Sequence, residues 1–266
     1  HAADLIKSGQ QDMIIAGGSL LINKIQKKQN KIIPLDSEHF SLFRIMPKNQ
    51  EIKKIFITAS GGPFYFKKNI NLSNVSMKQV LSHPKWKMGI NNTIDSSNFI
   101  NKVLEIFELS ILYNIDLTKI DFLISKEAFI HSLILFNDNT ISVNCFNNNM
   151  LIPLVKPLNS IFNTKNIFLS SKKIFDISNF NLTSHIDKRF IIFKHLNKIK
   201  KMTHMQQISF LVLNNIAHSK YQNNEIKYND IIKFILSNIP KNDNNINLNS
   251  FNNILDFIKN LKNNFF

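Results

Sequence analysis

The sequence predicts an α/β protein, in which an α+β domain with a mixed sheet precedes a domain of packed helices. Short apolar segments of strand type recur through the first 150 residues. Beyond residue 189, apolar residues instead recur at helical spacing, as Ile231, Phe234 and Ile235 do. The chain has 266 residues and a hydrophobic fraction of 44%, which is enough for a substantial core in one or two domains.

The N-terminal residues 1–35 alternate between helix-like and strand-like segments. Helices are predicted at 1–8 and 20–29, and strands at 13–16 and 31–35. None of the six glycines is spaced as in a dinucleotide-binding fingerprint or a phosphate-binding loop. The chain therefore carries no complete nucleotide-binding motif of these two kinds.

Residues 36–150 have the pattern expected of the α+β domain. Strands are predicted at 54–59, 120–124, 131–136 and 140–146, the last two joined by a hairpin turn at 137–139. A polar stretch, residues 65–92, contains the only tryptophan, Trp86. Its length is typical of an active-site lid, with Gly89 as a hinge.

The C-terminal part begins with a linker and continues as helices. Pro153 and Pro157 mark the linker, residues 151–182. The helical domain covers residues 183–266, with helices predicted at 189–200, 206–221, 228–239 and 251–261.

Composition restricts the partners. The net charge of +15 could attract nucleic acid or an acidic membrane surface. The lysines, however, are scattered among Asn, Ile and Phe, as A+T-rich codon usage produces, and form no stripe with aromatic platforms. No apolar run approaches the roughly 18 residues that span a bilayer. We therefore expect a soluble protein without nucleic-acid or membrane partners. Its expected location is the cytoplasm of a bacterium, such as one with a reduced genome, or, alternatively, a plastid-type organelle.

Cys145 is the only cysteine, so the chain can form no intramolecular disulfide. The residues around it do not activate a thiol, and we interpret it as a buried structural thiol.

An acidic pair follows the strand predicted at 31–35. Asp36 and Glu38 are two residues apart, a spacing that at a strand end directs both carboxylates to one side. Two hard oxygen ligands of this kind suit Mg²⁺ or Mn²⁺. The same short pattern also fits a solvated loop, and His39 beside it fits a packing or capping residue.

Residues 93–105 allow two interpretations. Asp95, Ser96 or Ser97 could cap a helix whose first N–H groups favour an anion. Asn101 and Lys102 lie four and three residues before Glu105, so all three side chains project to one side. A carboxylate beside an ammonium stays ionised, as a metal ligand must. An ordinary capped helix with an ion pair would have the same sequence.

Four segments occur in a fixed order: LDSEH at 35–39, SGGPF at 60–64, HPKWKMG at 83–89 and TIDSSNFINKVLE at 93–105. Together they resemble 1-deoxy-D-xylulose 5-phosphate reductoisomerase, which commits carbon to the methylerythritol phosphate route to isoprenoids. The resemblance is close over residues 36–150 and looser beyond, where it rests on Phe175–Ser178 and Leu213–Ala217.

The resemblance implies a divalent metal and a sugar-phosphate substrate. Asp36, Glu38 and Glu105 would be the ligands of one Mg²⁺ or Mn²⁺, and Ser37 would hold the substrate backbone beside it. The substrate phosphate and neighbouring hydroxyls would be bound by a larger set: Ser60, His83, Ser96, Asn101 and Lys102.

The resemblance also implies NADPH and a lid. Trp86 and Met88 would seal the site, while Gly89 and Met150 would lie on the cofactor side. The metal would polarise the ketone and its adjacent hydroxyl for a C–C bond shift, and the resulting aldehyde would take a hydride from NADPH. A homodimer is the family's usual state.

The chain departs from the family pattern in several places. Residues 1–35 would be a remnant of the N-terminal NADPH-binding domain, whose glycine-rich fingerprint has no counterpart here. Val103 replaces a glycine, Tyr65 an arginine, and Leu211–Asn215 an Asn-Ala-Ala-Asn-Glu run. These departures indicate a divergent reductoisomerase that turns over substrate with an NADPH domain from elsewhere, or a non-catalytic homologue or partial chain that binds metal and substrate only.

Overall fold

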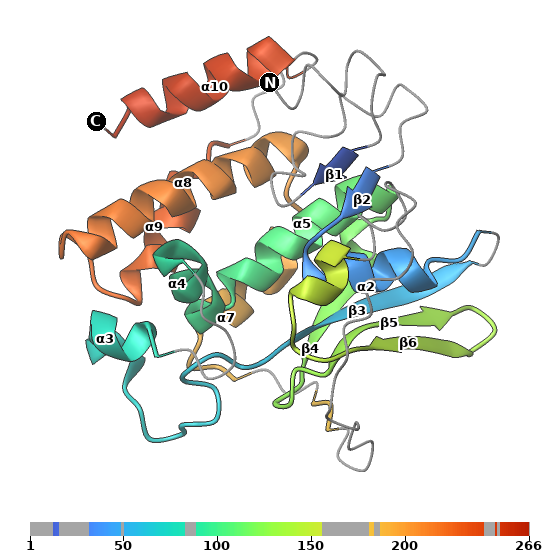
Figure 1. Cartoon of the computed structure of the whole chain (residues 1–266). Coiled ribbons are helices and arrows are strands. Elements are labelled where there is room, and N and C mark those ends of the chain that lie inside the picture. The colour runs from blue at the N-terminus through green and yellow to red at the C-terminus, as the bar shows by residue number, and fades with distance from the viewer. Residues whose placement is uncertain are drawn as a thin grey trace. The chain divides into compact units, whose positions relative to one another are not determined.

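The computed structural model describes residues 13–15, 32–48, 51–82, 89–155, 181–183, 187–241, 248 and 251–265 (Figure 1). The chain divides into two compact units. The first comprises residues 1–60 and 108–185, and the second residues 61–107 and 186–266. Each unit is thus assembled from two separate chain segments. The predicted domain limits at residues 36, 151 and 183 stay predictions.

A four-stranded mixed sheet forms the core of the first unit. β3 (Ile52–Ala59) runs parallel to β4 (Ile120–Ile124) and antiparallel to β5 (Ile130–Phe136), and β6 (Ile141–Cys145) pairs antiparallel with β5. Ile55 and Ile57 on β3 are fully buried, as central-strand residues should be. β6 is an edge strand, and its Ile141 is 60% exposed.

Helix α2 (Ser37–Ile45) packs on β5 and β6, following a small parallel pair, β1 (Met13–Ile15) and β2 (Ile32–Pro34). The buried hydroxyls of Ser41 and Ser132 lie 2.6 Å apart and form a hydrogen bond between α2 and β5. A 3₁₀ turn, η3 (Leu117–Lys119), leads into β4.

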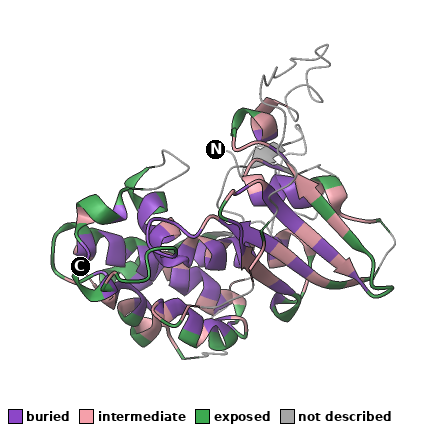
Figure 2. Cartoon of the chain, turned by 90° about the horizontal axis from the view of Figure 1, so that it is seen from below, coloured by how far each residue is buried: buried purple, intermediate pink, exposed green. Residues whose placement is uncertain are grey.

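The second unit is helical. Its elements are η2 (Leu72–Asn74), α3 (Met77–Val80), α4 (Ile90–Asn98), α7 (Ile191–Ile199), α8 (His204–Gln222), α9 (Asp230–Asn238) and α10 (Phe251–Asn263). α7 and α9 bury one side and expose residues on the other, α8 is mostly buried, and α4 is exposed only in its first turn (Figure 2). The helix α5 (Ile100–Tyr113) is continuous, and its residues from Glu108 onward are grouped with the first unit.

A sharp turn at Phe99 separates α4 from α5. Phe99 adopts left-handed backbone angles with φ of 67°, which is unusual for a bulky residue. Its ring lies 4.8 Å from that of Phe190 and 4.9 Å from that of Phe193, and it is almost completely buried. The Asn98 side chain accepts a hydrogen bond from the N–H of Ile100. Aromatic packing and this cap hold the turn in place.

Arg189 anchors the loop that follows the Gly61–Gly62 turn. Its guanidinium donates to the backbone carbonyls of Tyr65 and Lys67, at 2.9 and 2.6 Å, and is held by the Asp187 carboxylate at 2.6 Å. At Tyr65, where the resemblance expects an arginine, the loop is therefore fixed by an arginine from a distant part of the sequence.

The mixed sheet and the helices confirm the predicted fold class. The strands predicted at 54–59, 120–124, 131–136 and 140–146 are confirmed, and so is the hairpin turn, where Asn139 has a φ of 67°. The four C-terminal helices are confirmed with shifts of a few residues. The helices predicted at 1–8 and 20–29, and most of the linker, lie outside the described residues.

Several local predictions were wrong or incomplete. α4 begins at Ile90 with Gly89 as its N-cap, so Asp95, Ser96 and Ser97 do not cap a helix. The polar stretch 65–92 contains η2 and α3, and residues 151–155 of the linker are helical. Among the helices that the structure describes, none is both long and apolar enough to cross a membrane.

Cys145 is partly rather than fully buried, and that burial raises the pKa of its thiol. A raised thiol pKa makes the thiolate scarcer, which agrees with a structural role.

Ile57 and Ile141 offer a test of the first unit's core. Replacing Ile57 by alanine removes a fully buried side chain from β3 and should lower the free energy of unfolding by about 2–5 kcal/mol. The matched variant Ile141→Ala, on the exposed edge strand, should change it by less than about 0.5 kcal/mol. Urea unfolding followed by circular dichroism measures both, and equal losses would contradict the sheet assignment.

Candidate functional site

Asp36 begins helix α2. Its side chain accepts hydrogen bonds from the N–H groups of Glu38 and His39, at 3.0 and 3.2 Å, which is the geometry of an N-cap. Asp36 and Glu38 follow the strand β2 closely, as predicted, but the strand-end geometry expected to direct both carboxylates to one side was wrong, because β2 ends at Pro34 and the two carboxylates lie at a helix start. The Glu38 side chain also accepts a hydrogen bond from the Ser37 hydroxyl.

On α5, three polar side chains project to one side, as their spacing predicted. The Lys102 ammonium donates to both carboxylate oxygens of Glu105, at 2.9 and 2.8 Å, and the Asn101 amide donates to one of them. Lys102 and Glu105 are both buried. The ammonium beside Glu105 compensates the cost of removing its charge from water.

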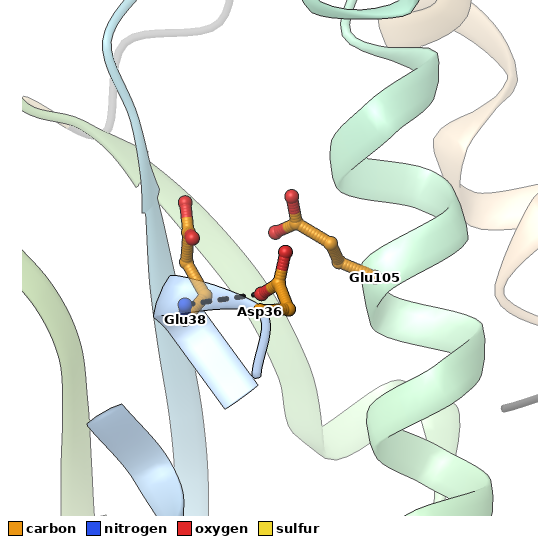
Figure 3. A group of neighbouring side chains, drawn as sticks. All are labelled: Asp36, Glu38 and Glu105. Atoms are coloured by element: carbon orange, nitrogen blue, oxygen red, sulfur yellow. Dashed lines mark hydrogen bonds between the residues drawn. The ribbon is translucent and has the colours of Figure 1, made fainter. Parts of the chain in front are cut away.

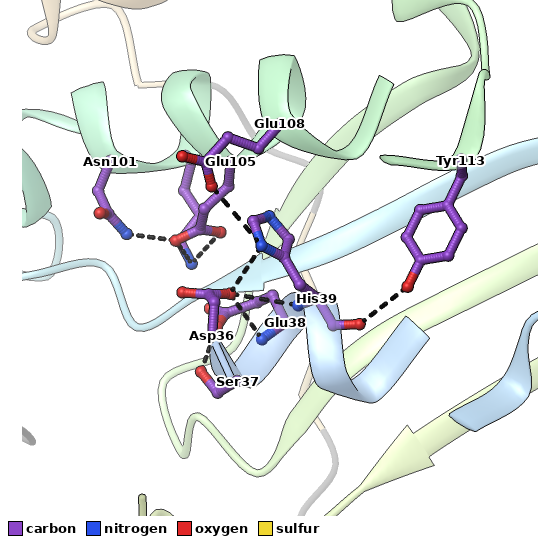
Figure 4. Close-up of polar contacts among 9 residues, drawn as sticks. Asp36, Ser37, Glu38, His39, Asn101, Glu105, Glu108 and Tyr113 are labelled. Atoms are coloured by element: carbon purple, nitrogen blue, oxygen red, sulfur yellow. Dashed lines mark hydrogen bonds and ion pairs between the residues drawn. The ribbon is translucent and has the colours of Figure 1, made fainter. Parts of the chain in front are cut away.

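Further along α5, two residues contact the start of α2. His39 Nδ1 lies 3.6 Å from a carboxylate oxygen of Glu108 and 3.8 Å from one of Asp36, and the Tyr113 hydroxyl donates to the backbone carbonyl of His39 at 3.2 Å (Figure 4). Burial raises the pKa of the Tyr113 hydroxyl, so it stays protonated and can donate. The resemblance did not single out Glu108, although its place one turn after Glu105 could have indicated it.

Three carboxylates form one group of neighbouring side chains. One oxygen from each of Asp36, Glu38 and Glu105 lies within 4.8 Å of the other two (Figure 3). Oxygen ligands about 2.0–2.6 Å from a single ion can have this separation. Such a group of hard, negatively charged donors is chemically suited to Mg²⁺ or Mn²⁺ rather than to softer metals.

The Gly61–Gly62 turn packs directly on α4. Gly62 has a φ of 56°, and a Cβ atom there would lie 2.9 Å from the backbone oxygen of Ser96. α5 begins at Ile100, two residues after α4 ends, and its first turn is the helix start that would favour an anion. Ser96 itself is half-buried in the last turn of α4.

The remaining predicted residues are less constrained by the structure. Ser60 follows the last residue of β3, and Met150 is 40% exposed ahead of the helical residues 151–155. Gly89 is exposed at the N-cap of α4. His83, Trp86 and Met88 lie outside the described residues, so their predicted roles are untested.

The fold is shared with solved reductoisomerases. A crystal structure of DOX-P reductoisomerase in complex with NADPH, fosmidomycin and magnesium superposes with a TM-score of 0.82 at 22% identity, covering 98% of this chain and 70% of that one. The Zymomonas mobilis 1-deoxy-D-xylulose 5-phosphate reductoisomerase, in complex with NADPH, gives 0.80 at 20% identity, covering 98% and 69%. The chain thus has the fold of this class of enzyme.

Sequence comparison identifies the family. Residues 32–113 match the family model for the 1-deoxy-D-xylulose 5-phosphate reductoisomerase C-terminal domain. The reductoisomerase of Pelagibacter ubique is 34% identical over 234 residues, which is 85% of this chain and 58% of the relative. That of Clostridium novyi is 30% identical over 88% of this chain and 61% of the relative. The chain belongs to the 1-deoxy-D-xylulose 5-phosphate reductoisomerase family, and it spans about three fifths of the length of these relatives.

Gly62 offers a test of the contact between the glycine turn and α4. Gly62→Ser places a side chain against the Ser96 backbone at a positive φ and should cost roughly 1–3 kcal/mol of stability. The same change at Gly89, where no atom lies within 4 Å of the added Cβ, keeps a favoured N-cap and should be close to neutral. Urea unfolding compares the two variants, and a neutral Gly62→Ser would show that the turn does not press on α4.

Proposed function

We propose that this chain forms the metal- and substrate-binding part of an enzyme that converts 1-deoxy-D-xylulose 5-phosphate into 2-C-methyl-D-erythritol 4-phosphate with NADPH and a divalent metal. This step belongs to the synthesis of isoprenoid precursors. The observation that carries the proposal is the convergence of the Asp36, Glu38 and Glu105 carboxylates. Membership of the reductoisomerase family supports it.

In this proposal Asp36, Glu38 and Glu105 hold one Mg²⁺ or Mn²⁺. The fit rests on the donor set, since three carboxylates would leave a strong local negative charge that a single Lys102 does not balance. A bound divalent ion supplies Lewis-acid polarisation of the substrate ketone and adjacent hydroxyl. The N-cap hydrogen bonds fix the Asp36 carboxylate before any ion binds. Less conformational entropy is therefore lost when this side chain binds an ion.

The substrate phosphate would lie against the α4 end and the α5 start. Ser60, Ser96, Asn101 and Lys102 supply two hydroxyls, an amide and an ammonium, which are donors suited to a phosphate. Ser37 would hold the substrate backbone beside the carboxylates. His83, Trp86 and Met88 would close over the substrate and exclude water from the aldehyde formed by the C–C bond shift.

NADPH would supply the hydride that reduces this aldehyde, with Gly89 and Met150 on the nicotinamide side. The chain carries no complete dinucleotide fingerprint, so we propose that further sequence or a separate polypeptide binds the rest of the cofactor. We also expect the working enzyme to be a homodimer.

The metal site can be tested by direct binding. Glu105→Gln removes one charged oxygen donor and should weaken Mn²⁺ binding by at least about tenfold, measured by electron paramagnetic resonance of the unbound ion. Glu51→Gln makes the same chemical change at an exposed residue and should leave Mn²⁺ affinity unaltered. Wild-type affinity in Glu105→Gln, Asp36→Asn and Glu38→Gln alike would refute the metal assignment.

Turnover is tested separately. NADPH oxidation with 1-deoxy-D-xylulose 5-phosphate and Mn²⁺ should be recovered when the chain is combined with the N-terminal NADPH-binding domain of a relative. Glu105→Gln should abolish this activity, while Glu51→Gln should retain it. Metal and substrate binding without turnover in every combination would instead identify a non-catalytic homologue.

A further inference from the structure

A buried polar cluster joins α4 to α8 within the second unit. The Asn214 amide donates to both carboxylate oxygens of Asp95, at 3.0 Å each, and His218 Nε2 lies 2.8 Å from one of them. Asp95, Asn214 and His218 are 5%, 1% and 1% exposed. The cluster is therefore sealed from solvent, and α8 supplies every donor in these contacts.

The chemistry of the cluster fixes the donor at His218. An ionised carboxylate only accepts hydrogen bonds, so His218 Nε2 must carry the proton that points at Asp95. Asn214 and His218, four residues apart on α8, thus both donate hydrogen bonds to the Asp95 side chain of α4. A carboxylate held by three such bonds cannot turn without breaking one of them.

Asp95 immediately precedes Ser96, and the residue on the other side of Ser96 is held as well. The Ser97 hydroxyl donates to the carbonyl of Ile94 at 2.6 Å and lies 3.1 Å from the Tyr228 hydroxyl. Gly62 packs against the Ser96 backbone oxygen. Ser96 is half-buried, and its neighbours Asp95 and Ser97 are buried. The contacts of these two neighbours therefore set the direction of the Ser96 side chain.

The cluster is also incompletely satisfied. Asn214 Oδ1 and His218 Nδ1 are buried and have no hydrogen-bond partner among the described residues. Apolar side chains of similar size would fill the same space without this cost. Stability alone therefore does not explain why Asn214 and His218 are polar. Holding Asp95 in one orientation does explain it.

We infer that His218 and Asn214 are positioning residues that fix the rotation of α4 and thereby aim the Ser96 hydroxyl at the substrate phosphate. The inference rests on the proposed function, because it assigns Ser96 a phosphate to bind. Neither residue touches substrate. They act through Asp95, which shares the helical turn with Ser96.

A pair of variants at one position separates positioning from mere packing. His218→Met keeps the volume but removes the donor, and it should weaken binding of inorganic phosphate by roughly tenfold or more, because misdirected donors lose contact steeply with distance. His218→Gln places an amide N–H near the former Nε2 and should restore most of the affinity. His195→Met on α7 makes the same change outside the cluster and should bind phosphate as the wild type does.

Phosphate and Mn²⁺ are titrated separately by calorimetry, and amide NMR follows the Ser96 resonance. The expected result is lost phosphate affinity and a lost phosphate-induced shift of Ser96 in His218→Met, with Mn²⁺ affinity within twofold of wild type. Unchanged phosphate affinity in a folded His218→Met overturns the inference, while the Mn²⁺ result still stands for the metal site. If His218→Met does not fold, Asn214→Ala decides, since wild-type phosphate affinity there overturns the inference equally.

A wild-type chain that binds Mn²⁺ but not phosphate would refute the phosphate subsite of the proposed function, and the inference with it. A chain that binds phosphate but not Mn²⁺ would refute the metal assignment alone. The two failures are therefore distinguishable in one set of titrations.

Discussion

The left-handed turn at Phe99 is the constraint on which the candidate site depends. It places Ser96 at the end of one helix and Asn101, Lys102 and Glu105 at the start of the next. A non-glycine residue in this conformation costs about 1–2 kcal/mol. Packing against the rings of Phe190 and Phe193 buries Phe99 and offsets this cost. Aromatic residues far along the sequence therefore determine where the polar groups of the candidate site lie.

Charge burial is the second constraint. Glu105 is 4% exposed, and it satisfies its carboxylate through Lys102 and Asn101, both supplied by the same helix. Asp36 satisfies part of its own carboxylate with backbone N–H groups of α2. Both carboxylates therefore have hydrogen-bond partners close in sequence that hold them in place. Their orientation does not depend on a bound ion. This arrangement resembles the preorganisation that metal-binding carboxylates usually have.

Apolar runs predicted the strands, turn residues predicted the hairpin and helical spacing predicted the C-terminal helices, because β3 and β5 bury most of their apolar residues and the buried positions of α9 recur at helical spacing. The common direction of Asn101, Lys102 and Glu105 also followed from spacing alone. The break between α4 and α5 did not, since Phe99 is not a residue that normally ends a helix. Contacts such as those of His39 with Glu108 and of Asp95 with His218 depend on tertiary packing. The substrate-binding roles proposed for individual residues came only from resemblance to a family.

The Asp95 cluster has a consequence for biogenesis. His218 lies 123 residues beyond Asp95, and Arg189 lies 124 beyond the Tyr65 carbonyl that it binds. During synthesis from the N-terminus, the Asp95 carboxylate therefore stays hydrated by water, and α4 cannot reach its final packing until α8 leaves the ribosome. Closing so long a loop is slow compared with forming a helix. The C-terminal end of α4 is thus among the last regions to mature, and a nascent chain stalled before α8 would contain Asp36, Glu38 and Glu105 without an ordered Ser96.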